Sequence, residues 1–245
     1  MKIENILISQ PAPVNGSPYS DLISKYKLNI DFFPFFKVEP ISGRDFRTQK
    51  INILDYTAIV FTAKSTIDAF FKICEELRVA VPETMKYFCL SEAVAPYLQK
   101  HIVYRKRKIF YGTGTIESII TSIGTKHKDE KFLIATTDSC KPDVFKLFTK
   151  AKLKHANAVF SNTVYSDLST IDIKKYQMLV FYSPTDVASL LSNYPEFEAG
   201  DLMFATYGPN TAKALKAAKI ASEITAPTPD APSIAKALQL YFEKK

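Results

Sequence analysis

The sequence has no tryptophan and few of the residues on which crosslinks and metal sites depend. Its 245 residues contain three cysteines, three histidines and seven glycines. Cys74, Cys89 and Cys140 are widely spaced and odd in number, which favours buried thiols in a reducing compartment over a disulfide framework. No histidine is spaced with cysteines or carboxylates as a ligand set, so we expect no metal site.

The motifs of several large enzyme classes are also absent. The sequence has no P-loop, no GxGxxG fingerprint and no GxSxG elbow, and residues 112–114 (GTG) are too short for a phosphate loop. No apolar stretch approaches the length of a membrane span, and residues 1–11 do not have the pattern of a signal peptide. We therefore expect a cytoplasmic protein that does not bind or cross a membrane.

The charge is positive, with a formal net value of +7 and a pI near 9.1. This balance predicts attraction to anions without naming the anion. The densest basic run, residues 104–108 (YRKRK), could be a nucleic-acid patch. We instead interpret it as a solvated entry to the short predicted strand that follows, and expect no nucleic-acid partner.

The most regular pattern in the chain is a strand, a tight turn and a helix. Residues 204–219 read FATYGPNTAKALKAAK, where an apolar run stops before Gly208 and a helical pattern begins at Pro209. Glycine gives the turn its backbone freedom, and proline suits a first helical position. The free amides of such a helix start, with the positive helix end, favour an anion.

This pattern recurs, which indicates an internal duplication. Residues 58–71 (AIVFTAKSTIDAFF) align without a gap with residues 178–191 (MLVFYSPTDVASLL), a displacement of 120 residues. Residues 87–98 align with the pattern that starts at Phe204, a displacement of 117 residues. Two motifs displaced by nearly the same amount predict paired domains rather than a solenoid.

Short apolar runs alternate with helical patterns in each half, which predicts an α/β fold of two similar domains, each a five-stranded parallel sheet flanked by helices. The predicted strands are 6–8, 30–36, 58–61, 86–90, 108–111, 132–135, 158–160, 178–182, 202–206 and 221–224. The predicted helices are 17–26, 65–77, 92–100, 115–123, 143–153, 185–193, 210–219 and 232–242.

Equivalent connectors follow the second strand of each half, at residues 37–40 and 163–166. If the chain crosses between sheets at both connectors, one domain is discontinuous and the other continuous. The discontinuous domain then comprises residues 1–37 and 166–245, and the continuous domain residues 38–165. A simpler division near residue 125 is the alternative.

Three predicted strand-to-helix turns lie at the carboxyl ends of strands, where open α/β sheets bind ligands. They contain Thr62, Lys64 and Ser65; Ser183, Pro184 and Thr185; and Gly208, Pro209, Asn210 and Thr211. The hydroxyls of these turns could simply cap helices, each contributing about 1 kcal/mol. In a basic chain of two linked domains, we favour a binding site for a polyanion.

In order and over nearly the whole length, these motifs resemble those of the uroporphyrinogen-III synthase family. The resemblance rests on FTAKSTIDAFF, VFYSPTDVASLL, YGPNTAKALKAAK, the pair Val164-Tyr165 and the tail APTPDAPSIAKAL. It implies a two-stranded linker between the domains, the discontinuous arrangement, an active cleft between the domains and no cofactor.

The resemblance also implies a substrate and a reaction in tetrapyrrole (haem) biosynthesis. The substrate would be hydroxymethylbilane, a linear tetrapyrrole with acetate and propionate groups on every ring. This family of lyases removes the terminal hydroxyl group, inverts the last ring through a spiro intermediate and releases uroporphyrinogen III. Tyr165 matches the family's cleft tyrosine and is the candidate proton donor, with linker packing as its alternative role. The turn residues would hold carboxylates, and we expect a monomer.

The sequence departs from the family pattern at five positions that could contact carboxylates. Gln10 replaces an arginine, Ala63 a serine, Ser91 a glycine, Val94 a threonine, and Asn210 a residue that is commonly threonine. These changes fall mainly in the continuous domain. The alternative function is therefore a noncatalytic two-domain module that binds a small acidic ligand.

Overall fold

The computed structural model describes residues 2–14, 16–140 and 143–244. The chain divides into two compact units: unit 1 contains residues 1–37 and 165–245, and unit 2 contains residues 38–164. Tyr165, which we expected at the end of the continuous domain, belongs to unit 1. In the described ranges, no helix is both long and apolar enough to cross a membrane.

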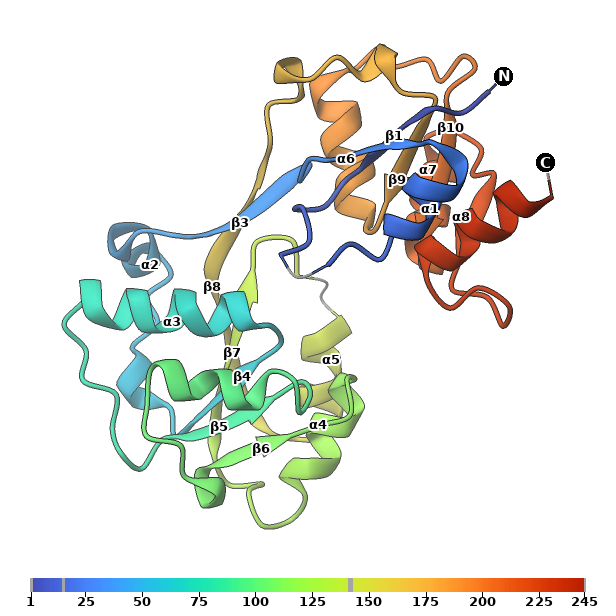
Figure 1. Ribbon diagram of the computed structural model, residues 1–245. Coiled ribbons are helices and arrows are strands. Elements are labelled where there is room, and N and C mark those ends of the chain that lie inside the picture. The colour runs from blue at the N-terminus through green and yellow to red at the C-terminus, as the bar shows by residue number, and fades with distance from the viewer. Residues whose placement is uncertain (1, 15, 141–142, 245) are drawn as a thin grey trace. The chain divides into compact units, whose positions relative to one another are not determined.

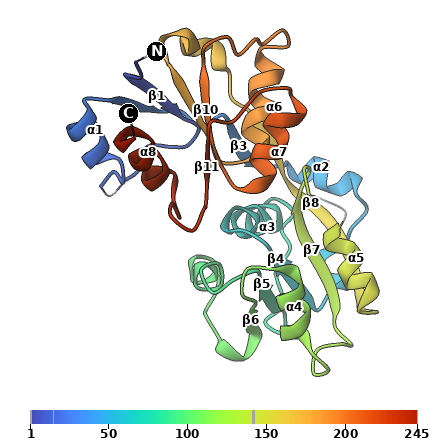
Figure 2. The same ribbon diagram turned by 90° about the vertical axis from the view of Figure 1, so that its right-hand side faces the viewer.

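Unit 1 is built on a five-stranded parallel sheet with the strand order β11-β10-β9-β1-β2. Of these strands, β1, β9 and β10 are labelled in Figure 1. Its strands are β1 (Asn5–Ile8), β2 (Asn29–Phe32), β9 (Met178–Phe181), β10 (Met203–Tyr207) and β11 (Ile224–Ala226). Its α-helices are α1 (Ser20–Tyr26), α6 (Pro184–Asn193), α7 (Pro209–Ala217) and α8 (Ile234–Glu243). Helices α1 and α8 cover one face of the sheet, and α6 and α7 cover the other (Figure 2).

Unit 2 is built on a six-stranded sheet with the order β3-β8-β7-β4-β5-β6. Its strands are β3 (Phe36–Pro40), β4 (Ala58–Phe61), β5 (Lys86–Cys89), β6 (Ile109–Tyr111), β7 (Lys131–Thr137) and β8 (Lys154–Tyr165). Its α-helices are α2 (Gly43–Thr48), α3 (Lys64–Glu76), α4 (Ile116–Ile123) and α5 (Asp143–Lys150). Short 3-10 helices in the two units are η1 (Ile53–Asp55), η2 (Ala95–Lys100), η3 (Lys106–Lys108), η4 (Leu168–Thr170) and η5 (Ile173–Lys175).

Each sheet buries both of its faces. Successive residues of a strand point to opposite faces. Ile59 and Phe61 therefore join the core beneath α3, whereas Ala58 and Val60 join the core beneath α4 and α5. In unit 1, Leu179 faces the core beneath α6 and α7, and its neighbours in β9 face the opposite core. Burial on both faces explains why these strands are continuous apolar runs rather than alternating ones.

The sixth strand of unit 2 comes from the two-stranded linker. The amide of Ile41 donates to the carbonyl oxygen of Phe160, and the amide of Ser166 donates to that of Phe35, as antiparallel pairing of β3 with β8 requires. The predicted strand over residues 30–36 divides into β2 and β3. Pro34, which has no amide hydrogen, lies at the break. The expected count of five strands is therefore one too low for unit 2.

The two sheets place equivalent strands at equivalent positions. β11, β10, β9, β1 and β2 of unit 1 correspond in spatial order and in the repeat to β6, β5, β4, β7 and β8 of unit 2. Residues 58–72 and 178–192 have the same burial class at every position. Each set of five strands takes three strands from one half of the sequence and two from the other, so the chain must cross between units twice.

One local prediction was displaced along the chain, one was wrong, and one helix was missed. The strand predicted over residues 221–224 lies at Ile224–Ala226. The helix predicted over residues 92–100 is a 3-10 helix that begins at Ala95. Helix α2 was not predicted, although Ser42 caps it by accepting a hydrogen bond from the Asp45 amide at 3.1 Å. A serine followed three residues later by an acidic residue is a helix-start signal that the sequence offered.

Candidate functional site

The turns after β9 and β10 lie next to each other at the carboxyl edge of the unit 1 sheet. β9 pairs with β10 on one side and with β1 on the other, and the register pairs Thr206 with Phe181. The structure thus brings together two of the predicted turns, residues 183–185 and 208–211. Ligands of open parallel sheets bind at this edge.

In the turn after β9, Ser183 and Asp186 cap the start of α6. Ser183 Oγ accepts a hydrogen bond from the Asp186 amide at 3.3 Å, and Asp186 Oδ2 accepts from the amides of Tyr182 (2.9 Å) and Ser183 (2.8 Å). Pro184 is exposed, occupies the first helical position and has no amide hydrogen to offer. The amide of half-buried Thr185 has no acceptor within the helix, so it can serve a ligand.

Asp186 is a residue of this turn that the sequence analysis missed. It is 1% exposed, and burial raises the pKa of its carboxyl group although hydrogen bonds from Tyr182 and Ser183 oppose that rise. Ser9, which follows β1, is a further polar neighbour and is 5% exposed. The spacing Ser-x-x-Asp at a predicted helix start is a capping signal that could have identified Asp186.

In the turn after β10, Gly208 has a φ of 86°, which glycine adopts readily. A Cβ atom at Gly208 would meet no atom within 4 Å other than those of its chain neighbours, so there is space beside the backbone. Helix α7 has no side-chain cap, and the amide of exposed Asn210 has no acceptor within the helix. Pro209 is also exposed, whereas Thr211 is 2% exposed and is the predicted residue least able to reach a ligand.

Three tyrosines lie at the same edge and were not among the predicted site residues. Tyr182 and Tyr207 stack on each other, and the Tyr182 hydroxyl lies 2.7 Å from that of Tyr19. Tyr19 is 4% exposed, and burial together with the hydrogen bond to Tyr182 raises the pKa of its hydroxyl group. Both hydroxyls of this pair therefore stay protonated well above neutral pH.

In unit 2, the turn after β4 is the counterpart of the turn after β9. Thr62 and Ser65 are half-buried and Lys64 is exposed. Ala63 stands where Ser183 stands in unit 1 and supplies no cap. Thr66 instead donates through Oγ1 to the Ala63 carbonyl oxygen (2.7 Å) and accepts from the Ala63 amide (3.3 Å). The Ser65 amide has no acceptor within the helix.

Lys64 belongs to a charged cluster on the α3 side of unit 2. Its Nζ atom lies 5.6 Å from the centroid of the Tyr97 ring, and Lys100 Nζ lies 5.3 Å from the same centroid. Asp68 accepts from the Tyr97 hydroxyl at 2.6 Å and pairs with Lys100 at 3.0 Å and His101 at 2.7 Å. Burial alone would raise the pKa of Asp68, but these hydrogen bonds outweigh it and hold that pKa below its usual value.

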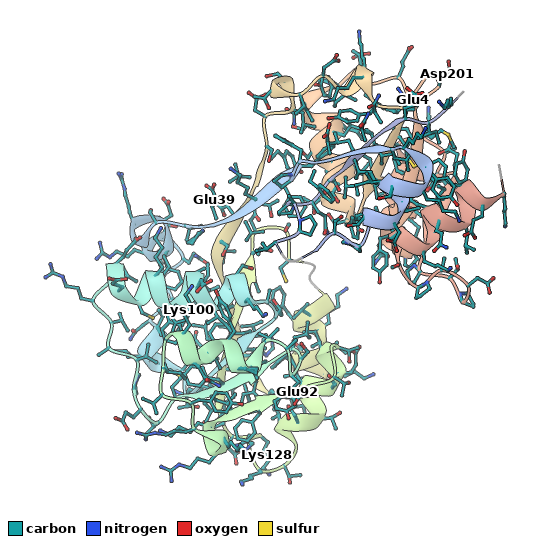
Figure 3. The ribbon with its side chains drawn as sticks, in the orientation of Figure 1. Glu4, Glu39, Glu92, Lys100, Lys128 and Asp201 are labelled. Carbon is teal, nitrogen blue, oxygen red and sulfur yellow. The ribbon has the colours of Figure 1, made fainter. Side chains whose placement is uncertain are left out.

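The two lysines of this cluster differ in whether an acidic side chain pairs with their charge. Lys100, labelled in Figure 3, has Asp68 as its ion-pair partner. Lys64 has no acidic partner within the part of the chain that the structure describes. Lys64 is therefore the cation of this cluster that can pair with a ligand anion, while the Tyr97 ring restrains its position.

Unit 2 does not repeat the second turn of unit 1. Ser91, at the place of Gly208 in the repeat, forms an isolated bridge with Thr113, and no α-helix begins there. Glu92, labelled in Figure 3, occupies the place of Pro209 and would repel an anion. Val94 is 8% exposed and apolar. In unit 2, the turn after β4 is the better anion site.

Tyr165 is the last residue of β8 and is 42% exposed. Within the described ranges, no hydrogen bond involves its hydroxyl group, so the phenol is open to a ligand. The described part of the chain contains no group of three or more histidine, cysteine, aspartate or glutamate residues that could hold a metal ion.

The fold and the site together define a two-domain α/β protein. Its two sheets are largely parallel, a two-stranded linker joins the domains, and candidate anion sites lie at strand ends. The family model described as uroporphyrinogen-III synthase HemD matches residues 17–236, so the chain belongs to this family. No curated protein sequence matches the chain.

Two solved structures share the fold. A uroporphyrinogen-III synthetase from Helicobacter pylori matches with a TM-score of 0.62 and 15% identity, over 99% of this chain and 100% of that one. A mutant uroporphyrinogen III synthase from the extremely thermophilic bacterium Thermus thermophilus matches with a TM-score of 0.60 and 12% identity, again over 99% and 100%. At these identities the likeness supports the two-domain α/β fold, which confirms the predicted fold class.

Proposed function

We propose that the protein is a uroporphyrinogen-III synthase that converts hydroxymethylbilane into uroporphyrinogen III, with inversion of the last ring and loss of water. Family membership supports this reaction. The observation that carries the proposal for this chain is the pair of neighbouring helix starts in unit 1. There, the amides of Thr185 and Asn210 lack helical acceptors beside the open space at Gly208.

These helix starts suit the carboxylates of the proposed substrate. Free first-turn amides and the positive end of the helix dipole both favour an anion. In unit 2, Lys64 and the uncapped start of α3 offer a further cation and free amides. A substrate with two carboxylates on every ring can use several such sites at once, so each single site contributes modestly to affinity.

Tyr165 is proposed as the proton donor. The terminal hydroxyl group of the bilane leaves as hydroxide when its bond to the methylene carbon breaks, and a proton converts it into water. A phenol carries a proton near neutral pH and can supply it. The electron-deficient methylene carbon then bonds to the carbon of the last pyrrole ring that already carries the methylene bridge, which gives the spiro intermediate. That bridge bond breaks, the freed methylene carbon bonds to the unsubstituted α-carbon of the same ring, and the proton lost from this α-carbon restores the balance.

The selectivity of the proposed reaction comes from the shape in which the bilane is held. The same reactive molecule can also close without inverting its last ring, giving the I isomer. Fixing one folded shape in several carboxylate sites favours the inverted product, since correct positioning lowers the barrier of one closure and not the other.

One incubation tests this proposal. Purified protein is mixed with freshly generated hydroxymethylbilane, and the products are oxidised and separated into porphyrin I and III isomers. Predominance of the III isomer supports the synthase, and the I isomer alone rejects it. Tight retention of uroporphyrinogen without turnover would favour a noncatalytic binding module, an alternative motivated by the missing cap at Ala63 and the altered turn at Ser91.

A further inference from the structure

The tyrosines at the carboxyl edge of unit 1 form a pair with a defined geometry. Thr206 pairs with Phe181, so the next residues along the strands, Tyr207 and Tyr182, are cross-strand neighbours. Their ring centroids lie 5.6 Å apart, with 28° between the ring planes. This is an offset-stacked arrangement, in which each ring covers one face of the other.

One ring of the pair is held by a hydrogen bond, and the other belongs to a partly exposed residue. The Tyr182 hydroxyl is held at 2.7 Å by that of Tyr19, which is buried. Tyr207 is 36% exposed, although residues 204–206 are fully buried. On its other side, Tyr207 pairs with Ala226, whose methyl group can cover little of a ring. Part of Tyr207 is therefore accessible to a ligand.

Each ring also lies directly before a helix start. Tyr182 precedes Ser183 and α6, and Tyr207 precedes Gly208 and α7. The backbone at Gly208 has space beside it, because no atom beyond the neighbouring residues Tyr207 and Pro209 lies within 4 Å of a Cβ built there. A flat ring on Tyr207 would thus have free helix-start amides within reach of its substituents.

The internal duplication serves as a control for the importance of this pair to the fold. At the displacement of 120 residues, Tyr182 corresponds to Thr62, and at the displacement of 117 residues, Tyr207 corresponds to Leu90. Unit 2 builds the same strand order and the same burial around β4 with neither aromatic ring. The fold therefore does not require a stacked pair at this edge. This favours a role for the pair in binding a ligand.

We propose that Tyr207, supported by Tyr182 and Tyr19, is an aromatic subsite on which one pyrrole ring of the substrate stacks. A carboxylate of that ring then reaches the free amides at the start of α6 or α7. This inference rests on the proposed function for the identity of the ring. An aromatic contact of this kind changes affinity by about 3- to 10-fold.

The test compares Tyr207→Leu with Tyr207→Phe. Leucine removes the flat face, whereas phenylalanine keeps it and loses only the hydroxyl group. We expect Tyr207→Leu to raise the KM for hydroxymethylbilane about 3- to 10-fold, and to weaken the binding of oxidised uroporphyrin III, followed by porphyrin fluorescence, by a similar factor. Tyr207→Phe should stay within about twofold of the parent in both measurements.

Phe242→Leu is the matched control. Tyr26 and Phe242 form another stacked pair in unit 1, with centroids 5.2 Å apart and 29° between the planes, on α1 and α8. Removing one of its rings should lower thermal stability about as much as Tyr207→Leu, with KM and porphyrin binding unchanged. A comparable loss of binding in Phe242→Leu would show that the effect is a general loss of stability and would overturn the subsite.

The outcomes separate the subsite from the proposed function. If the parent makes the III isomer and Tyr207→Leu matches Tyr207→Phe, the subsite is wrong and the synthase stands. If the parent makes only the I isomer, the synthase is wrong, and porphyrin binding decides the subsite. In that case, weaker porphyrin binding by Tyr207→Leu, with the other variants unchanged, supports a ring site. Equal porphyrin binding by all variants, or no porphyrin binding by the parent, overturns it.

Discussion

Replacing Ser183 by alanine removes a side chain with two contacts at the start of α6. Ser183 Oγ accepts from the Asp186 amide at 3.3 Å and donates to the Asp186 carboxylate at 3.2 Å. Loss of an N-cap acceptor costs about 1 kcal/mol. Loss of a hydrogen bond to a buried carboxylate adds roughly 1–2 kcal/mol. We expect Ser183→Ala to lower the free energy of unfolding of unit 1 by about 2–3 kcal/mol.

Ser233→Ala is a control that isolates the carboxylate contact. Ser233 caps α8 in the same unit by accepting from the Lys236 amide at 3.2 Å, and it has no carboxylate partner within the described ranges. Its replacement should cost about 1 kcal/mol. Urea denaturation followed by circular dichroism measures both losses. Equal losses in the two variants would refute the reasoning, because Ser183 would then act on the helix start alone.

Two further predictions concern titration and proton donation. Burial raises the pKa of Asp186, so the folded state keeps this proton to a higher pH than the unfolded chain, whose value is near 3.8. As pH rises from about 4 through that raised pKa, the unfolding free energy of the parent should therefore fall relative to that of Asp186→Asn. The same pH dependence of unfolding free energy in both proteins would contradict this. Tyr165→Phe should lower kcat for III-isomer formation by about 100-fold or more, without loss of stability. An unchanged kcat would show that water can replace the phenol as the proton donor.

The sequence predicted the features that depend on local pattern. The strand over residues 58–61 was predicted to the residue, because four consecutive buried apolar positions precede a clear helix start. The turns at Ser183 and Gly208 were found for the same reason, since proline, glycine and capping residues act on their immediate neighbours. The duplication then gave the fold class without any knowledge of strand order.

The aromatic pair could not be found in this way, because its geometry depends on which strands are adjacent. Tyr182 and Tyr207 become neighbours only through the pairing of β9 with β10. Tyr19 reaches Tyr182 across a separation of 163 residues. Asp186 differs from these residues, because the spacing of the capping signal was visible in the sequence and was overlooked. The pKa of its carboxyl group, however, follows from tertiary burial.

The lost cap of unit 2 can be restored, and the outcome bears on how the site works. Ala63 has φ and ψ of −151° and 162°, close to −145° and 157° at Ser183. A serine at position 63 should therefore reach the Thr66 amide as Ser183 reaches that of Asp186. We expect Ala63→Ser to raise the free energy of unfolding of unit 2 by about 1 kcal/mol in urea denaturation.

The effect of the same variant on turnover distinguishes two uses of the α3 start. The new hydroxyl group would occupy the Thr66 amide, while leaving the Ser65 amide and Lys64 unchanged. If the substrate uses the Thr66 amide, Ala63→Ser should gain stability and show a higher KM for hydroxymethylbilane. A gain in stability with an unchanged KM would show that the substrate contacts unit 2 through the Ser65 amide or Lys64 and not through the Thr66 amide. A loss of stability would contradict the geometric equivalence of the two turns.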